Sequence, residues 1–326
     1  MTTSRNITSL EPARIAALAP WLLGAALIAY AWFSGGYLVT VMSFALIYAI
    51  FVAGLNVFMG FAGQVSFGQN AFAAISGYTS AVLTTTYGME PLVGMAIGIS
   101  GALAFALLIG YPTLRLKGHY LAMATLAVGL IVYEVAVHWQ SVTQGYMGIS
   151  GIPPLGIGRY EVTSEKSQLL LLVIVACIML FIAWRIRNSR LGRAFVAVAG
   201  SEDAARALGI DVAHYKLVSF LISAGYAALA GSLFVHVVGF VSPEVYGMHM
   251  VVLAFTMLYV GGIGTIVGPL IGAIVISLLP EMFRQFKDYQ DLIYGAVLIL
   301  LLIYAPKGIA SLSSLLMRDR KSALPS

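Results

Sequence analysis

Long apolar runs separated by short polar breaks dominate this chain. Between Arg14 and Glu90 there is no Asp, Glu, Lys or Arg, a stretch of 75 residues. A helix needs about 20 residues to cross the hydrocarbon core of a bilayer, so this stretch has room for three crossings. Glycine-rich breaks at 34–36 and 60–63 divide it. We interpret the runs as helices because they are too long for the strands of a membrane barrel.

The same pattern continues to the end of the chain and predicts an all-α polytopic membrane protein with about ten (eight to ten) transmembrane or re-entrant helices. The two segments at 247–262 and 265–280 have only 16 residues each, so we expect them to be tilted, re-entrant or broken. The predicted spans are 15–33, 38–60, 65–86, 91–113, 119–138, 168–184, 217–239, 247–262, 265–280 and 291–305.

Composition agrees with this pattern, since 60% of the residues are hydrophobic and only 10% are charged. About 25% charged residues is usual in a soluble domain, and a soluble fold cannot remove so much apolar surface from water. An ordinary cytosolic enzyme, a disordered chain and a nucleic-acid-binding protein are therefore excluded. The single cysteine, Cys177, lies within an apolar run and carries no information on redox compartment.

The distribution of charge predicts the orientation. With both termini in the cytoplasm, 14 of the 18 basic residues fall on the cytoplasmic side and eight of the 13 acidic residues on the other. The expected organisation is a cytoplasmic tail at 1–14, a single membrane domain at 15–310 and a cytoplasmic tail at 311–326. An alternative for the first span is a signal peptide, since Arg14 and the apolar run precede an A-x-A sequence at 29–31. Cleavage there would leave nine spans, but the apolar run continues past that point.

Two hydrophilic segments interrupt the membrane domain. The first, 139–166, is rich in Gly and Pro and is expected to be an ordered outer loop. The second, 185–216, is basic at its start and favours a helix in its middle, with Ser201 as N-cap, Glu202 and Asp203 in the first turn, and Gly209 as the terminator. It is either a docking element for a soluble partner or a connecting loop. Its length and its own helix favour docking.

Glycine-rich sequences at 60–68 and 261–269 break the apolar pattern at membrane depth. The first carries Gln64 and Ser66 and is followed by Gln69 and Asn70, all polar groups that are costly against lipid and are expected to face the interior or an aqueous path. Broken helices are common in transport paths. The alternative is a kink whose polar side chains bond neighbouring helices. Small residues at four-residue spacing, as at Gly264, Gly268 and Gly272, indicate close helix packing.

These motifs resemble the branched-chain amino-acid ABC importer permeases of the M type. The resemblance covers roughly residues 40–310, with the motifs in the family's order. It rests on Gly54-Leu55-Asn56, Gly63-Gln64-Val65-Ser66-Phe67-Gly68, Gly77-Tyr78, Arg115-Leu116-Lys117-Gly118-His119-Tyr120, Gly192-Arg193-Ala194, Asp203-Ala204-Ala205 through Gly209-Ile210, Tyr215-Lys216-Leu217, Ser242-Pro243-Glu244 and Gly261-Gly262-Ile263-Gly264 through Gly268-Pro269.

The resemblance implies a subunit of an importer in the bacterial inner membrane, with a second, H-type permease, two ABC ATPases and a periplasmic substrate-binding protein as partners. The chain itself would hold no cofactor or metal, and ATP and Mg²⁺ would bind the ATPases. The ATPase-coupling loop would comprise Ser201, Glu202, Asp203, Ala204, Ala205 and Gly209. The translocation path would include Asn56, Gln64, Ser66, Gln69, Asn70, Gly261, Gly262 and Gly264.

Two positions depart from the family pattern. Asp203 stands where Glu is usual, which keeps the charge. Gln69 stands where many members have His, so a histidine's role cannot be carried over and the branched-chain substrate is put in doubt. Permeases of the same family for urea or small aromatic or carboxylic solutes remain alternatives.

Other classes lack their required chemistry in this sequence. There is no G-x-x-x-x-G-K-[ST] motif for nucleotide binding, the five histidines show no metal-ligand spacing, and no constellation for a membrane-embedded enzyme occurs. A secondary transporter normally needs several buried ionisable groups. Apart from Asp291, the first residue of the span 291–305, Glu134 is the only acidic residue within a predicted span. It lies near the outer end of its span and is either functional or an interfacial residue reaching water.

Overall fold

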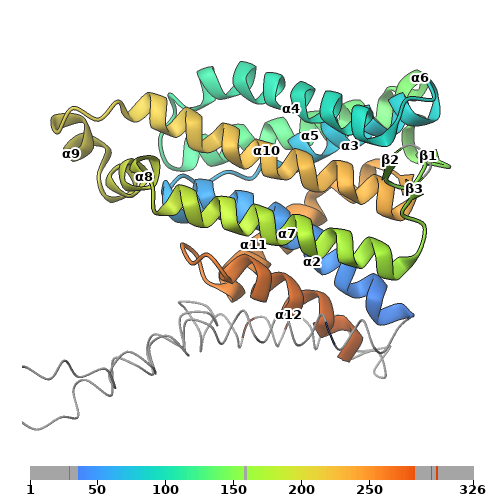
Figure 1. Ribbon diagram of the computed structural model, residues 1–326. Coiled ribbons are helices and arrows are strands. Elements are labelled where there is room, and N and C mark those ends of the chain that lie inside the picture. The colour runs from blue at the N-terminus through green and yellow to red at the C-terminus, as the bar shows by residue number, and fades with distance from the viewer. Residues whose placement is uncertain (1–28, 30–35, 158–159, 283–294, 296–298, 300–326) are drawn as a thin grey trace, which may run out of the picture.

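The computed structural model describes residues 36–157 and 160–282, with Ala29, Gly295 and Ile299 in addition. This part of the chain is a bundle of long helices lying roughly side by side (Figure 1). Six of its helical segments are long and apolar enough to cross a membrane. They are Tyr37–Phe61 (α2 with the π-helical turn η2), Pro91–Thr113 (α4), His119–His138 (α5), Glu165–Arg187 (α7), Val212–Val238 (α10) and Pro243–Gly261 (the short 3₁₀ turn η4 with α11).

Two shorter helices complete the bundle. Helix α3 spans Gln69–Thr85 and α12 spans Gly268–Met282. The predicted spans 15–33 and 291–305 lie largely outside the described residues, so the predicted number of about ten is not confirmed. The observed helical, membrane-spanning architecture agrees with the predicted class.

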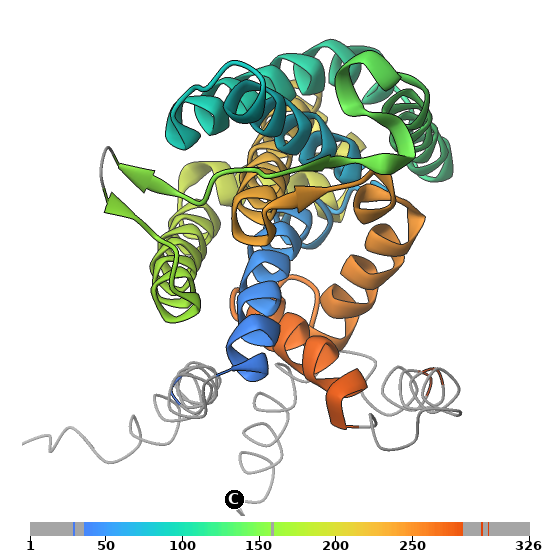
Figure 2. The same ribbon diagram turned by 90° about the vertical axis from the view of Figure 1, so that its right-hand side faces the viewer.

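The most buried helices lie at the centre of the bundle. In the most apolar window of each span, 78% of the residues of α2 and 67% of those of α10 are buried, against 28% for both α4 and α7. An end-on view shows α2 and α10 surrounded by the other helices (Figure 2). Small residues permit this packing: a Cβ at Gly54 of α2 would collide with Tyr226 of α10, and one at Gly231 of α10 with the backbone of Ala73 in α3.

One end of the bundle carries the segment between α5 and α7 (Figure 1). It contains the helical turns α6 (Gln140–Thr143) and η3 (Gly145–Met147). Strand β1 (Ile149–Ser150) pairs antiparallel with β4 (Phe240–Val241), and β2 (Gly156–Ile157) with β3 (Tyr160–Glu161). The described residues of the predicted 139–166 loop are therefore ordered, and the pairing of β1 with β4 joins them to the end of α10.

The opposite end carries two short helices, α8 (Arg190–Gly200) and α9 (Glu202–Ala207). The sequence predicted one helix here, and α8 was missed. The segment is also shorter than predicted: α10 begins at Val212, not 217, because the Asp211 carboxylate accepts a hydrogen bond from the backbone N–H of His214 at 3.1 Å.

Candidate functional site: two broken helices tied to a pair of short helices

The two glycine-rich breaks that the sequence singled out lie against each other. The first follows η2 (Val57–Phe61) and runs through residues 62–68, so α3 begins at Gln69 and not at 65 as predicted. The second, residues 262–267, joins α11 (Met248–Gly261) to α12. A π-helical turn inside an α-helix is frequently found at functional sites.

Asn56 fastens the two breaks together. Its Nδ2 donates to the carbonyl oxygen of Thr265 at 2.7 Å, and its Oδ1 accepts from the backbone N–H of Gly264 at 2.8 Å. Both backbone groups are left free by the broken helix, so one buried amide satisfies a donor and an acceptor that would otherwise lie unpaired in a low-dielectric environment. A Cβ at Gly60 would lie 2.6 Å from the nitrogen of Gly264, so glycine is required for this close approach.

Gly264 provides the backbone N–H that bonds Asn56, whereas Gly261 matters for helix packing and Gly262 for backbone conformation. A Cβ at Gly261 would collide with the carbonyl of Gly268, and one at Gly272 with the carbonyl of Met257, so these glycines bring α11 and α12 into backbone contact. Gly262 has φ +111°, a backbone conformation that favours glycine. The expectation that the small-residue series 264, 268 and 272 is a packing face holds for its last two members.

The α8–α9 pair has the cap geometry expected from its sequence. The Ser201 side chain accepts a hydrogen bond from the Ala204 N–H at 3.2 Å, Glu202 and Asp203 lie in the first turn, and Gly209 has φ +80°. Asp203 is exposed and pairs with Arg206 at 2.9 Å. Ala205 is buried, whereas Ala204 is exposed.

A buried ion pair connects α9 to the helix bundle. Nζ of Lys216, the side chain of which is only 3% exposed, lies 2.8 Å from Oε1 of Glu202. Nε2 of Gln64 donates to the same oxygen at 3.3 Å. Glu202 in α9, Lys216 in α10 and Gln64 in the first break thus form one polar cluster, which we call the 64–202–216 cluster. Breaking such a pair on one side leaves a poorly solvated charge, so it resists separation.

Backbone packing reinforces this connection. Gly63 has φ +67°, and a Cβ there would lie 2.8 Å from the Cβ of Ala199 in α8. The first break is therefore in direct contact with α8 and linked by hydrogen bonding to α9. The two short helices and residues 62–68 are therefore joined by both packing and hydrogen bonding.

The other polar residues of the first break face the protein interior, as expected. Ser66 Oγ accepts from the Gly68 N–H at 3.4 Å, and Asn70 Nδ2 donates to the carbonyl of Tyr246 at 2.8 Å. Gln69 is 3% exposed, and neither Nε2 nor Oε1 has a hydrogen-bond partner among the described residues. Each unpaired buried polar group costs about 1–3 kcal/mol. Gln69 and Asn70 do not join the 64–202–216 cluster.

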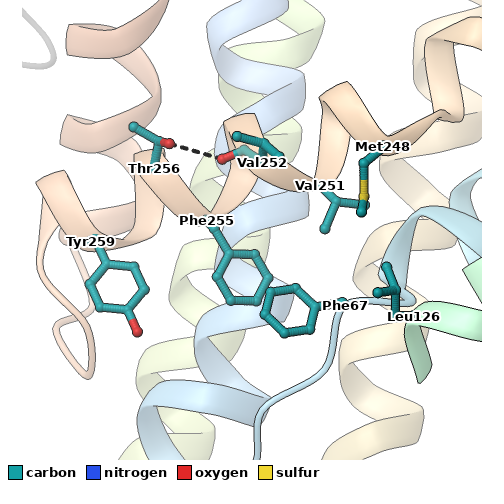
Figure 3. A pocket seen from close by; sticks show the side chains of 8 residues that line it. All are labelled: Phe67, Leu126, Met248, Val251, Val252, Phe255, Thr256 and Tyr259. Atoms are coloured by element: carbon teal, nitrogen blue, oxygen red, sulfur yellow. Dashed lines mark hydrogen bonds between the residues drawn. The ribbon is translucent and has the colours of Figure 1, made fainter. Parts of the chain in front are cut away.

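A largely apolar groove of about 460 Å³ lies beside α11 (Figure 3). The aromatic ring of Phe67, from the first break, is stacked on that of Phe255 in α11, with ring centroids 4.4 Å apart. Met248, Val252 and Tyr259 are exposed on the same helix. The groove is lined by Phe67, Leu126, Met248, Val251, Val252, Phe255, Thr256 and Tyr259.

Sequence reasoning missed the roles of Lys216, Phe67 and Phe255. A lysine at the start of an apolar run looks like a residue of the flanking loop. The one signal that Lys216 belongs to the helix was its place inside a helical pattern. Phe67 and Phe255 are 188 positions apart, so nothing local indicates their contact.

Glu134 is exposed and lies 3.4 Å from His138, which favours the interfacial interpretation. Within 36–157 and 160–282 no three His, Cys, Asp or Glu side chains gather as a metal site.

The helical bundle, the paired breaks and the apolar groove define a polytopic membrane protein with discontinuous helices, an architecture typical of permeases. The family model for the permease component of branched-chain amino acid transport systems matches residues 37–302, and the chain belongs to this family.

Individual relatives agree with the family match. The chain is 33% identical to the high-affinity branched-chain amino acid transport system permease protein LivM of Salmonella typhimurium, over 83% of this chain and 69% of that protein. It is 27% identical to LivH of the same organism, over 80% of this chain and 90% of that protein. Among solved structures, PsaBC from Streptococcus pneumoniae in complex with Fab aligns with a TM-score of 0.45 and 14% identity, over 87% of this chain and 97% of that chain.

Proposed function

We propose that this chain is the M-type permease subunit of an ATP-driven importer of branched-chain amino acids in the bacterial inner membrane. It forms half of the translocation path, and an H-type permease forms the other half. The similarity to proteins named LivM and LivH supports such a pair, and the higher identity to LivM supports the M-type assignment. ATP and Mg²⁺ act on two partner ATPases, and a periplasmic binding protein delivers the substrate.

The observation that carries this proposal is the 64–202–216 cluster. Helix α9 has exposed residues available for a partner at the end of the bundle, and its partly buried Glu202 is tied to the first helix break. An ATPase that lies outside the membrane needs such a connection in order to move the transport path within it. A secondary transporter needs no such element.

Charge supports placing α8 and α9 in the cytoplasm. Basic side chains gather at this end of the bundle, whereas Lys166 is the described basic residue near the strands at the other end. Positively charged loops are retained on the cytoplasmic side during insertion. The basic residues at the α8–α9 end are Arg115, Lys117, Arg185, Arg187, Arg190, Arg193, Arg206 and Lys216.

In the mechanism that follows, ATP binding draws the two ATPases together and displaces α9. The displacement passes through Glu202 and Gln64 to residues 62–68, which border the second break through Gly60 and Asn56. The paired breaks then rearrange, and the path changes its access from one face of the membrane to the other. The apolar groove beside α11 is compatible with aliphatic substrates and with helices of the second permease.

The test uses the most exposed apolar side chain of the α9 segment, Leu208, which is 81% exposed. We expect Leu208→Glu to abolish co-purification of the ATPases with the tagged chain from its native membrane, because a charge replaces an apolar contact, while the amount of inserted chain stays unchanged. The measurement is quantitative mass spectrometry of the purified complex.

The control is Leu116→Glu, which places the same charge at a 40% exposed leucine in the α4–α5 turn. It should retain the ATPases. Recovery of a second permease and ATPases with the unaltered chain, followed by leucine uptake in vesicles containing that complex, supports the proposal. Equal ATPase recovery with Leu208→Glu contradicts the coupling role of this segment, and a chain recovered alone contradicts the importer.

A further inference from the structure

A second, smaller cleft lies behind the groove of Figure 3, on the interior side of the Phe67–Phe255 pair. Phe67, Val251 and Phe255 line both the groove and the cleft, so these side chains form the wall between them. The cleft has no room for a water molecule. Its lining is completed by Phe51, Leu55, Ser66, Gln69, Asn70 and Ala254.

The unpaired amide of Gln69 lines this cleft. Ser66 Oγ and Asn70 Nδ2 have partners, and only Oδ1 of Asn70 does not, whereas both Nε2 and Oε1 of Gln69 lack partners among the described residues. The cleft leaves no space beside this amide for a water molecule that could pair with it. A carboxamide offers a donor and an acceptor together, which suits a ligand that carries both an acceptor and a donor group.

Apart from Ser66, Gln69 and Asn70, the residues that line the cleft are aliphatic or aromatic. Leu55, Val251 and Ala254 are buried and offer no hydrogen bonds through their side chains. These three side chains favour an aliphatic substrate group over a small polar solute.

We propose that the cleft behind Phe67 and Phe255 is a transient subsite for the substrate and that the stacked aromatic pair is its gate. The Gln69 amide binds the α-ammonium and α-carboxylate end of a neutral amino acid, and Leu55, Val251 and Ala254 contact its branched side chain. This inference rests on the proposed function and deepens it by assigning the groups that recognise the substrate.

The position of Phe67 explains how the gate opens. Phe67 lies in the irregular segment 62–68, where its backbone N–H donates to Oγ1 of Thr125 at 3.1 Å. Phe255 lies within the regular helix α11. Gln64, three residues before Phe67, bonds Glu202, so movement of α9 pulls the segment that carries one of the two rings and leaves the other in place.

The first experiment measures leucine uptake by vesicles containing the complete transporter. We expect Gln69→Leu to raise the KM for leucine about tenfold or more, since a hydrogen-bonded charged group of the substrate loses its partner. The same variant should keep or raise the thermal unfolding temperature of the complex, because an unpaired buried amide is removed.

The matched control is Ser223→Ala. Ser223 is also buried with an unpaired hydroxyl, but it lies in α10 and lines neither the groove nor the cleft. Its removal should leave the KM unchanged. An unaltered KM for Gln69→Leu, with normal uptake by the unaltered transporter, overturns the subsite and leaves the importer assignment standing.

The second experiment tests the gate without requiring transport. In the full complex carrying Cys177→Ser, the thiol introduced by Gln69→Cys should react slowly with a small water-soluble maleimide. Adding Phe255→Ala should raise the rate about tenfold or more by opening the wall, whereas adding Tyr259→Ala, which affects the groove alone, should not. Equal rates with and without Phe255→Ala overturn the gate. Absence of leucine uptake by the unaltered complex contradicts the proposed function itself.

Discussion

At the scale of single residues, the two acidic side chains of α9 differ in burial, so their substitution should change the stability of the protein to different extents. Glu202 is the partly buried member of the acidic pair in α9, with its side chain 19% exposed, whereas the Asp203 side chain is 81% exposed. The exposed Asp203–Arg206 pair contributes little to stability, because water screens it. The Glu202–Lys216 pair has almost no such screening at the lysine, so its loss has a larger effect.

We therefore expect an order of stability among three variants. Glu202→Gln leaves the ammonium of Lys216 buried without its counter-charge and should destabilise the protein by about 3 kcal/mol. Lys216→Met should cost less, since Glu202 still reaches water, and the double variant should lose less than the sum of both. Thermal unfolding in detergent measures all three. A purely additive double variant would contradict the pairing, and Asp203→Asn is the control expected to change little.

At the scale of elements, two discontinuous helices meet through backbone contact. Gly60 and Gly264 approach so closely that Asn56 bonds the freed groups of the second break while contacting the first. The second break depends on Asn56, at the end of α2, for two of its hydrogen bonds, and Gly60 leaves room for this contact. The two breaks should move as one unit when the α8–α9 pair is displaced.

Gly60→Ala tests this interdependence. The added methyl group would displace Gly264 and break the Asn56 hydrogen bonds, so we expect transport to fall at least tenfold while insertion is retained. The control is Gly101→Ala in α4, where a Cβ meets nothing within 4 Å. Alanine there should stabilise the helix by up to about 1 kcal/mol and leave transport intact. Equal uptake by the two variants would show that the contact between the breaks is dispensable.

At the scale of the whole molecule, the two ends of the bundle are built differently. One end carries basic loops and the helices α8 and α9, and the other carries four short strands and few basic residues among those described (Figure 1). This asymmetry predicts the orientation of the protein, because basic loops resist translocation. In the proposed importer, substrate delivery and ATP hydrolysis would act at opposite ends.

Accessibility of introduced thiols measures this orientation in a Cys177→Ser background. We expect Thr163→Cys, at an exposed site near the strands, to react with a membrane-impermeant maleimide in intact spheroplasts. Asp203→Cys, exposed on α9, should react only after permeabilisation. The reverse pattern would refute the assignment of α9 to the cytoplasmic side and with it the coupling mechanism.

Local sequence information determined the class of protein and many of its boundaries. Apolar runs over 37–61, 91–113 and 119–138 coincide with helices because backbone hydrogen bonding in lipid leaves few alternatives. The Ser201 cap and the positive φ at Gly209 follow from local backbone chemistry, and the motif order placed the chain in its family. Helix α8 and the start of α10 were not anticipated, since a polar amphipathic segment has no strong apolar signal.

Only the tertiary structure decided which polar residues act together. The sequence grouped Gln64, Ser66, Gln69 and Asn70 by proximity, whereas the structure places Gln64 with Glu202 and Lys216, and Gln69 behind the Phe67–Phe255 pair. These contacts join residues 138 to 188 positions apart, or from different helices, and helical periodicity carries no information on such pairs. The physical reason is that the environment of a side chain in a helical bundle depends on which helices become neighbours. The packing of the complete bundle determines those neighbours.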